Sequence, residues 1–356
     1  MANQFQFDIF LEICKSRIGE NIIISPFSIN NILSLTANGA KNKTLDEMLK
    51  VLCHKTKEEM NKENESISSL KDKFESVTIS NAIFSKIQPK ESFLEMAKHY
   101  KAHIDLLEDA QQINKWCEKA TNGKISKIVD NISPDDLMIL INTIFFKGEW
   151  ERPFEKEKTE KNNFFNFGKE KKEIDFMKDR NYFPYFESCD IQAISLPYKQ
   201  DNIEALIILP KKGEEEDINK YIQNFTIENY NEIIKNLKKA RVILSLPKFK
   251  IEYEDELKPY FIKMGMVDAF GDDADFSEIE KGNKIGKILH KTYIKIDEEG
   301  TEAAAVTEVE MSMKGTKRKS TRTPIMDVNH PFLLMIRSNN LPDGHDILFI
   351  SKIESL

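Results

Sequence analysis

The spacing of hydrophobic residues changes along the chain, from helical intervals in the first half to strand-like alternation in the second. Apolar residues three and four positions apart predict helices, and alternation with a period of two predicts strands. In the first half this pattern predicts helices at 1–17, 26–33, 92–103 and 109–123, a capping box at 44–47 and a charged, solvated helix and loop within 55–76.

Strands are predicted at 77–84 and then mostly in the second half of the chain. The apolar run 137–146 predicts a strand that is buried on both faces. Helices at 219–238 and 255–264 interrupt the later strands, which are predicted at 164–167, 174–177, 182–187, 191–197, 203–209, 241–249, 288–297, 332–337 and 347–353. Helices first and strands later, without regular βαβ alternation, favour an α+β fold in one interwoven unit.

The segment 300–329 alternates like a strand but continues into a basic, turn-rich loop. Every second residue from Thr301 to Met311 is small or apolar, and the residues between them are mostly acidic or polar. The run of alanines at 303–305 has low strand propensity. We therefore expect an exposed segment that is able to insert into a sheet.

Two motifs around this segment resemble the serpin family: DEEGTEAAAVT at 297–307 is similar to the serpin hinge, and VNHPFLLMI at 328–336 to the family signature beyond the reactive loop. Further serpin-like motifs follow in the family's order: NIIISPFSI, NTIFFKGEWERPF, ILSLPKFKIEYEDELK, ADFSEI and ILHKTYIKIDEEGTEAAA. The resemblance implies the serpin fold, with a helix-rich N-terminal half interwoven with three β-sheets and an exposed C-terminal reactive loop. It also implies one domain over 1–356, with the loop at about 298–329. The loop beyond the expected scissile bond is longer than is usual in the family, and 55–76 matches no family segment.

The resemblance also implies roles for single residues of the loop. The hinge corresponds to Glu298, Glu299, Gly300, Thr301, Glu302, Ala303, Ala304 and Ala305. Counting seventeen residues from Glu298 places the reactive bond between Lys314 and Gly315. A lysine at this position suits the carboxylate-floored pocket of a trypsin-like protease. Met313 or Met311 would instead suit a chymotrypsin-like or cathepsin G-like pocket, and this register stays open by a residue or two.

The implied mechanism is suicide inhibition with a covalent 1:1 complex. A serine protease attacks the carbonyl of Lys314, and residues 301–314 then insert into the large sheet as a new strand. Fourteen residues at about 3.3 Å each carry the protease roughly 45 Å. New ladder bonds at about 1 kcal/mol each, with burial of Thr307, Val309 and Met311, total on the order of 10 kcal/mol. This is comparable with the stability of a whole domain. A non-inhibitory chaperone or carrier and a cysteine protease inhibitor are the alternatives, and the small hinge residues favour inhibition.

A second group of residues is expected within and above the large sheet. In the strand predicted at 288–297, His290 falls on the apolar face, where a lone histidine is usually a hydrogen-bonded core residue. By resemblance, Ser25, Ser28, Asn142 and His290 form the polar cluster under the centre of the sheet, which can be remade after the strands separate. Trp150 matches the tryptophan where the loop first inserts, unless it is simply a core aromatic. Lys248 and Glu298 match an ion pair there, worth under about 1 kcal/mol if it is exposed.

The numbers and positions of charged residues limit which classes of binding partner are expected. The 52 basic and 59 acidic side chains give a net charge of −7, which provides no general reason to expect nucleic acid or a membrane as partner. The basic run Lys317, Arg318, Lys319 and Arg322 is a solvated loop, a protease exosite, or a site for a polyanion or an import receptor. The resemblance implies a monomer that can self-polymerise on heating.

Other chemistry is not indicated. The four cysteines lack CxxC spacing, and His99 and His103 lack a third ligand at a recognised spacing, so we expect no metal. We find no catalytic motif and expect no cofactor and no catalytic residue, so the protein is interpreted as an inhibitor and not an enzyme. The N-terminal segment contains Asp8 and Glu12 instead of an uninterrupted apolar core, which predicts a cytoplasmic protein. Leaderless secretion stays open.

Overall fold

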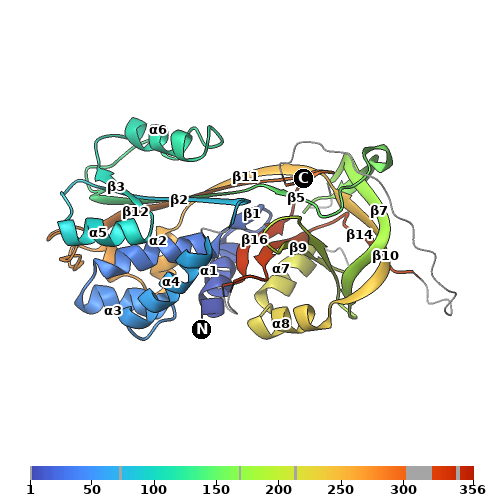
Figure 1. Ribbon diagram of the computed structural model, residues 1–356, viewed down its shortest axis with the longest axis horizontal. Coiled ribbons are helices and arrows are strands. Elements are labelled where there is room, and N and C mark those ends of the chain that lie inside the picture. The colour runs from blue at the N-terminus through green and yellow to red at the C-terminus, as the bar shows by residue number, and fades with distance from the viewer. Residues whose placement is uncertain (1, 72–73, 168–169, 212–214, 302–322, 342–344) are drawn as a thin grey trace.

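The structure is a computed structural model that describes residues 2–71, 74–167, 170–211, 215–301, 323–341 and 345–356. Its helices and strands form three sheets with helices around them (Figure 1). The α-helices are α1 (Ala2–Ser16), α2 (Pro26–Asn38), α3 (Asn42–Val51), α4 (Lys57–Lys71), α5 (Glu91–His99), α6 (Ala110–Ala120), α7 (Glu215–Gln223), α8 (Ile227–Asn236) and α9 (Lys258–Met264).

The five-stranded sheet has the order β11-β12-β4-β2-β3. The neighbouring strands β12 and β4 are parallel, with His290 opposite Asn142, whereas β11 runs antiparallel to β12 and β2 antiparallel to β4. Its strands are β2 (Val77–Ser85), β3 (His103–Leu106), β4 (Met138–Phe146), β11 (Phe249–Glu256) and β12 (Ile285–Ile296). Figure 1 shows α6 on one face of this sheet and α2, α3 and α4 on the other.

The nine-stranded sheet has the order β1-β16-β15-β9-β8-β7-β10-β14, and β6 also pairs with β7. Its strands are β1 (Ile22–Ile24), β6 (Glu160–Phe165), β7 (Lys171–Glu187), β8 (Ile191–Pro197), β9 (Ile203–Pro210), β10 (Lys238–Pro247), β14 (Ile325–Asp327), β15 (Phe332–Ser338) and β16 (Ile347–Ile353). The third sheet pairs β5 (Gly148–Glu149) with β13 (Gly300–Thr301). Two 3-10 turns, at Lys156–Lys158 and Asp268–Phe270, complete the described elements.

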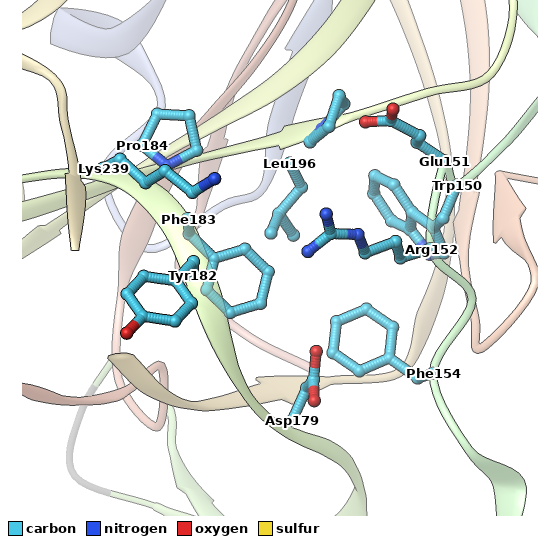
Figure 2. A pocket seen from close by; sticks show the side chains of 11 residues that line it. Trp150, Glu151, Arg152, Phe154, Asp179, Tyr182, Phe183, Pro184, Leu196 and Lys239 are labelled. Carbon is cyan, nitrogen blue, oxygen red and sulfur yellow. The ribbon is translucent and has the colours of Figure 1, made fainter. Parts of the chain in front are cut away.

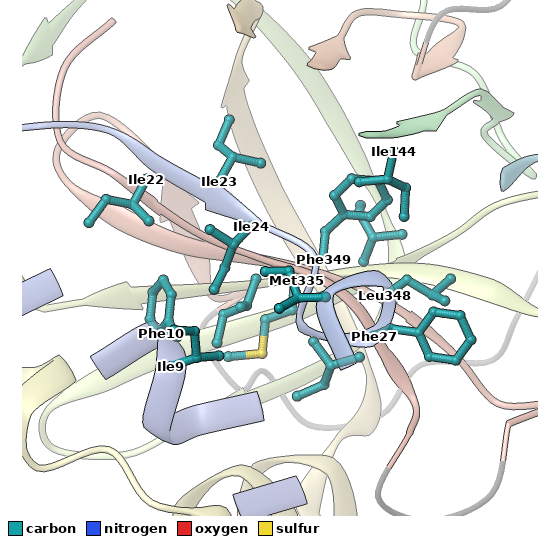
Figure 3. Packing of buried hydrophobic residues seen from close by; sticks show 14 of the residues in the cluster. Ile9, Phe10, Ile22, Ile23, Ile24, Phe27, Ile144, Met335, Leu348 and Phe349 are labelled. Carbon is teal, nitrogen blue, oxygen red and sulfur yellow. The ribbon is translucent and has the colours of Figure 1, made fainter. Parts of the chain in front are cut away.

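The main core lies where the N-terminal helices meet the C-terminal strands (Figure 3). There Ile9 and Phe10 of α1 and Phe27 of α2 lie beside Met335 of β15 and Phe349 of β16, and all five side chains are buried. A smaller cluster lies between α6 and the outer face of the five-stranded sheet. The inner face of that sheet and the nine-stranded sheet therefore share one apolar interior, which fixes where the strands and the loop segments above them lie.

The α+β class predicted from the sequence is confirmed, but several local predictions were wrong. The capping box at 44–47 does not form, because α3 begins at Asn42 and the Thr44 hydroxyl instead donates to Asp268. The helix predicted at 255–264 begins only at Lys258, after the strand β11, which was missed. The strands predicted at 174–177 and 182–187 form one strand, and the helix predicted at 219–238 is two. Finally, the sheet with the expected cluster has five strands and is not the larger one.

Candidate functional site

The strands β4 and β12 lie side by side, and we call the line between them the seam; it is closed by pairing over only part of its length. The parallel pairing runs from Met138 and Ile285 to Phe145 and Tyr293. Beyond Tyr293, β12 continues to Ile296 and pairs with β11 alone among the described strands. A charged cleft of about 530 Å³ lies past this point, lined by Lys156, Thr159, Asp175, Lys248, Lys295, Asp297, Glu298 and Glu299. We call this end of the seam its upper end.

The start of the predicted hinge is held against β5 at the upper end. Gly300 and Thr301 pair antiparallel with Glu149 and Gly148. Gly300 has φ of +146°, and a Cβ built there would lie 2.1 Å from the carbonyl oxygen of Gly148. Only glycine therefore fits between the loop and β5 without movement of one of them.

Thr301 points into the protein and contacts an aromatic stack. Its side chain is fully buried, and its hydroxyl lies 2.7 Å from the hydroxyl of Tyr198. The Tyr198 ring stacks on Trp150, with ring centroids 4.3 Å apart. Trp150 in turn donates from Nε1 to the carbonyl of Asp297 at 2.9 Å, just before the hinge. The predicted insertion tryptophan is thus joined to Asp297, just before the hinge, and through Tyr198 to Thr301 within it.

The predicted ion pair forms, but it is not an exposed one. Lys248 Nζ lies 2.9 Å from Glu298, whose side chain is 7% exposed, against 32% for Lys248. The Thr159 hydroxyl also donates to Glu298, at 2.7 Å. Burial raises the pKa of the Glu298 carboxyl, but the hydrogen bonds from Lys248 and Thr159 outweigh burial and hold the pKa below its usual value. The low value expected for an exposed pair therefore does not apply to it, because the Glu298 carboxylate is buried. The neighbouring Glu299 pairs with Lys156.

The four residues of the predicted polar cluster meet at the centre of the seam. Asn142 Oδ1 accepts from the Ser28 hydroxyl at 2.8 Å and lies 2.6 Å from His290 Nδ1. The backbone N–H of Ser25 points to His290 Nε2 at 3.2 Å, and the Ser25 side chain caps α2. Since Nε2 accepts, the proton must be on Nδ1, which donates to Asn142. His290 is therefore the neutral Nδ1–H tautomer.

Burial keeps this histidine neutral. His290 is fully buried, and desolvation lowers the pKa of its imidazole to about 3, although the hydrogen bond to Asn142 acts in the opposite direction. No charge therefore forms on this histidine at neutral pH. The cluster closes the two strands with neutral hydrogen bonds.

The hydrogen-bond network extends beyond the four predicted residues. Asn142 Nδ2 donates to Asn81 of β2 at 2.5 Å, and Asn81 donates to Asn31 of α2 at 2.8 Å. Asn81 and Asn31 were missed. A buried amide in a strand pattern was the available sign for Asn81, and Asn31 gave none beyond its place one turn after Ser28. The network thus ties α2 to three adjacent strands, β2, β4 and β12.

The remaining predicted loop residues lie outside the described part of the chain. They are the hinge residues Glu302, Ala303, Ala304 and Ala305, the reactive-bond candidates Lys314, Gly315, Met313 and Met311, and the basic residues Lys317, Arg318, Lys319 and Arg322. Their roles stay predictions.

The two histidines considered as metal ligands are separated by a chain reversal. His99 ends α5, whereas His103 begins β3 and stacks on Trp116 with centroids 5.6 Å apart. Within the described residues, no group of three or more His, Cys, Asp or Glu side chains is arranged to hold a metal ion. Over the same ranges, no helix combines the length and hydrophobicity needed to cross a bilayer.

Comparison with known proteins agrees with this geometry. The family model described as "Serpin (serine protease inhibitor)" matches residues 1–356. The chain is 32% identical to an uncharacterised serpin-like protein of Methanosarcina acetivorans, over 99% of this chain and 86% of that protein. It superposes with a TM-score of 0.88 on native tengpin, a thermophilic serpin, at 32% identity, covering 100% of this chain and 93% of tengpin. Human thyroxine-binding globulin complexed with thyroxine gives a TM-score of 0.88 at 26% identity, covering 99% and 97%.

The seam, hinge and polar cluster therefore occur in a chain that belongs to the serpin family. Members of this family are generally protease inhibitors, as the description of the family model states, and a structural relative that binds thyroxine shows that the fold also serves other purposes.

Proposed function

We propose that this chain inhibits serine proteases by trapping the acyl-enzyme when residues 301–314 insert between β4 and β12. The observation that carries the proposal is the position of Gly300 and Thr301, which lie where the pairing of these two strands has ended. A segment that follows β12 must reverse direction to enter the seam. It would then run antiparallel to both parallel neighbours and exchange one parallel ladder for two antiparallel ones. The gain in ladder bonds favours insertion once the loop is cut.

The reactive bond that we propose is Lys314–Gly315, with a trypsin-like protease as target. Met313 or Met311 would shift the target to a chymotrypsin-like enzyme. The test is incubation with trypsin and, separately, with chymotrypsin, followed by denaturing electrophoresis and mass spectrometry of the C-terminal peptide. An SDS-resistant complex with a peptide that begins at Gly315 supports both the mechanism and the register. A complex with another peptide start moves the bond.

A matched pair of variants at Thr301 tests whether loop insertion is the step that traps the protease. Thr301→Arg places a charged side chain where the hydroxyl of Tyr198 now lies, and it should slow insertion until hydrolysis of the acyl-enzyme wins. We expect this variant to be cleaved with no retained complex. Thr301→Ser keeps the hydroxyl and should form the complex. Equal complex formation by both variants would refute insertion as the trapping step.

The second candidate is a carrier without inhibitory activity, favoured by the similarity to the thyroxine complex. Cleavage without complex by every serine and papain-type protease tested would select this candidate. We further propose a cytoplasmic location and one domain over 1–356. The basic residues Lys317, Arg318, Lys319 and Arg322 are proposed as a contact for an acidic surface, and salt-sensitive retention on heparin, lost when all four are changed to Ser, tests that role.

A further inference from the structure

A cavity of about 250 Å³ opens beside Trp150, and Figure 2 shows the side chains around it. Its walls are apolar and come from three parts of the chain: Trp150 and Phe154 after β5, Phe183 of β7, and Leu196 of β8. These four side chains are buried, so they are held in place by the core behind them. We call this cavity the Trp150 pocket.

The rim of the Trp150 pocket is charged. In Figure 2 the guanidinium of Arg152 and the ammonium of Lys239 face the hollow, while the carboxylate of Glu151 points away. Within the described residues neither basic group forms an ion pair; Arg152 donates to Asn181 at 3.3 Å, and Lys239 lies over the Tyr182 ring. Asp179 also lines the rim as a carboxylate, which accepts from the backbone N–H of Arg180 at 2.7 Å. Beside the hollow, the two basic side chains of Arg152 and Lys239 therefore outnumber this one carboxylate.

Size and lining together define the ligand. Ligand pockets usually measure about 300–1,000 Å³, so this pocket suits a molecule of one or two rings. Flat aromatic walls favour a planar ring system, and two basic side chains above them favour an anion that can receive charge-assisted hydrogen bonds. We propose that the Trp150 pocket binds a small aromatic carboxylate, with the rings against Trp150, Phe183 and Leu196 and the carboxylate beside Arg152 and Lys239.

A ligand in this place would contact the residues that hold the hinge. Trp150 stacks on Tyr198, and the Tyr198 hydroxyl lies next to Thr301. The backbone N–H of Phe154 donates to the carbonyl of Glu298 at 2.7 Å. A molecule that binds this arrangement stabilises it against any state in which the hinge leaves β5. Binding itself does not depend on the proposed protease inhibition.

The chain offers a direct readout, because it has two tryptophans and only one lines the pocket. The full chain is labelled with 5-fluorotryptophan and titrated with naphthalene-2-carboxylate, and the ¹⁹F resonances are assigned with Trp116→Phe. We expect the Trp150 resonance to shift and that of Trp116, which belongs to α6, to stay. The dissociation constant should be on the order of 10⁻⁴ to 10⁻³ M for a ligand of this size.

Matched probes test whether binding requires the carboxylate of the ligand, and matched variants test whether it requires the basic side chains of the Trp150 pocket. The neutral naphthalene-2-methanol should bind at least about 5-fold more weakly, and Arg152→Ala with Lys239→Ala should weaken carboxylate binding by at least about 5-fold. Lys238→Ala removes a neighbouring exposed lysine that does not line the pocket, and it should change nothing. Three outcomes would each overturn the proposal. The first is that the Trp150 resonance does not shift at up to 5 mM naphthalene-2-carboxylate, roughly five times the weakest expected dissociation constant. The others are that 2-naphthylmethylamine binds more tightly than the carboxylate, or that Lys238→Ala weakens binding as much as the double variant does.

Discussion

The centre and the upper end of the seam between β4 and β12 are closed by different kinds of contact. At the centre, Asn142, His290 and their partners join the strands through buried neutral hydrogen bonds. At the upper end, the pairing has stopped, and the hinge is held by a close backbone contact, an aromatic stack and the pair between Glu298 and Lys248. We infer from this difference that the two regions have different roles. The hydrogen bonds at the centre determine how stable the closed sheet is, and the contacts at the upper end determine how readily the hinge separates from β5.

The largest expected effect is at the centre. Asn142→Leu keeps the approximate volume but removes three hydrogen bonds, to Ser28, His290 and Asn81, and leaves their buried partners unsatisfied. At about 1–3 kcal/mol for each buried unsatisfied group, the free energy of unfolding should fall by about 4 kcal/mol. Urea denaturation measures this loss. Ile144→Val, a purely apolar change on the same strand, should cost only about 1 kcal/mol, and equal losses would contradict a special role for the polar cluster.

A smaller loss is expected from the backbone contact at the upper end. Gly300→Ala forces a Cβ against Gly148 and should cost about 2–3 kcal/mol, or release the hinge from β5. Gly282→Ala is the control, since Gly282 also has a positive φ but has nothing within 4 Å of the position that a Cβ would take. The measurements are urea denaturation and hydrogen exchange of 298–301. Similar behaviour of the two variants would mean that φ alone, and not the contact, matters.

The pH dependence separates the two regions further. Folding holds the pKa of His290 near 3, well below the ordinary 6.5, so below pH 6.5 the unfolded chain binds a proton that the folded chain does not. Above pH 6.5, His290 therefore does not change the free energy of unfolding. As the pH falls from 6.5 to 3, His290 lowers the free energy of unfolding by about 1.4 kcal/mol per pH unit. Urea denaturation at pH 7 and pH 5 should show a shallower decline in His290→Gln than in the parent, whereas the exposed His99→Gln should decline as the parent does.

Changes to the ion pair between Glu298 and Lys248 should have the smallest effect on the free energy of unfolding. They should instead change whether the protein self-polymerises. Glu298→Lys sets two ammonium groups against each other at the upper end and should promote self-polymerisation on mild heating, seen by native gel electrophoresis. The charge swap Glu298→Lys with Lys248→Glu should restore monomers in part. If Glu298→Lys stays as monomeric as the parent protein under the same mild heating, the ion pair does not hold the upper end closed.

The sequence predicted the class and the strands that alternate cleanly, and it failed where tertiary contacts decide. β11 was missed because its outward residues Lys250, Glu252 and Glu254 are charged, which suits an edge strand but weakens the strand pattern. The capping box failed because Thr44 has a partner more than 200 residues away. The same is true of the site: His290 was placed on the correct face by its period of two, whereas the burial of Glu298 depends on Thr159 and Lys248 and could not be predicted from spacing.

The pairing of the first strand with the last also bears on biosynthesis. β1 pairs with β16, and β16 lies between β1 and β15 in the nine-stranded sheet. β1 must therefore wait, while more than 300 residues are translated, until its partner β16 has been made. Sheets built from such distant segments form slowly and expose apolar surface meanwhile. Nascent chains that stall before β15 should therefore be clients of chaperones, and a truncation that removes β16 should abolish folding even though it leaves the hinge and the seam intact.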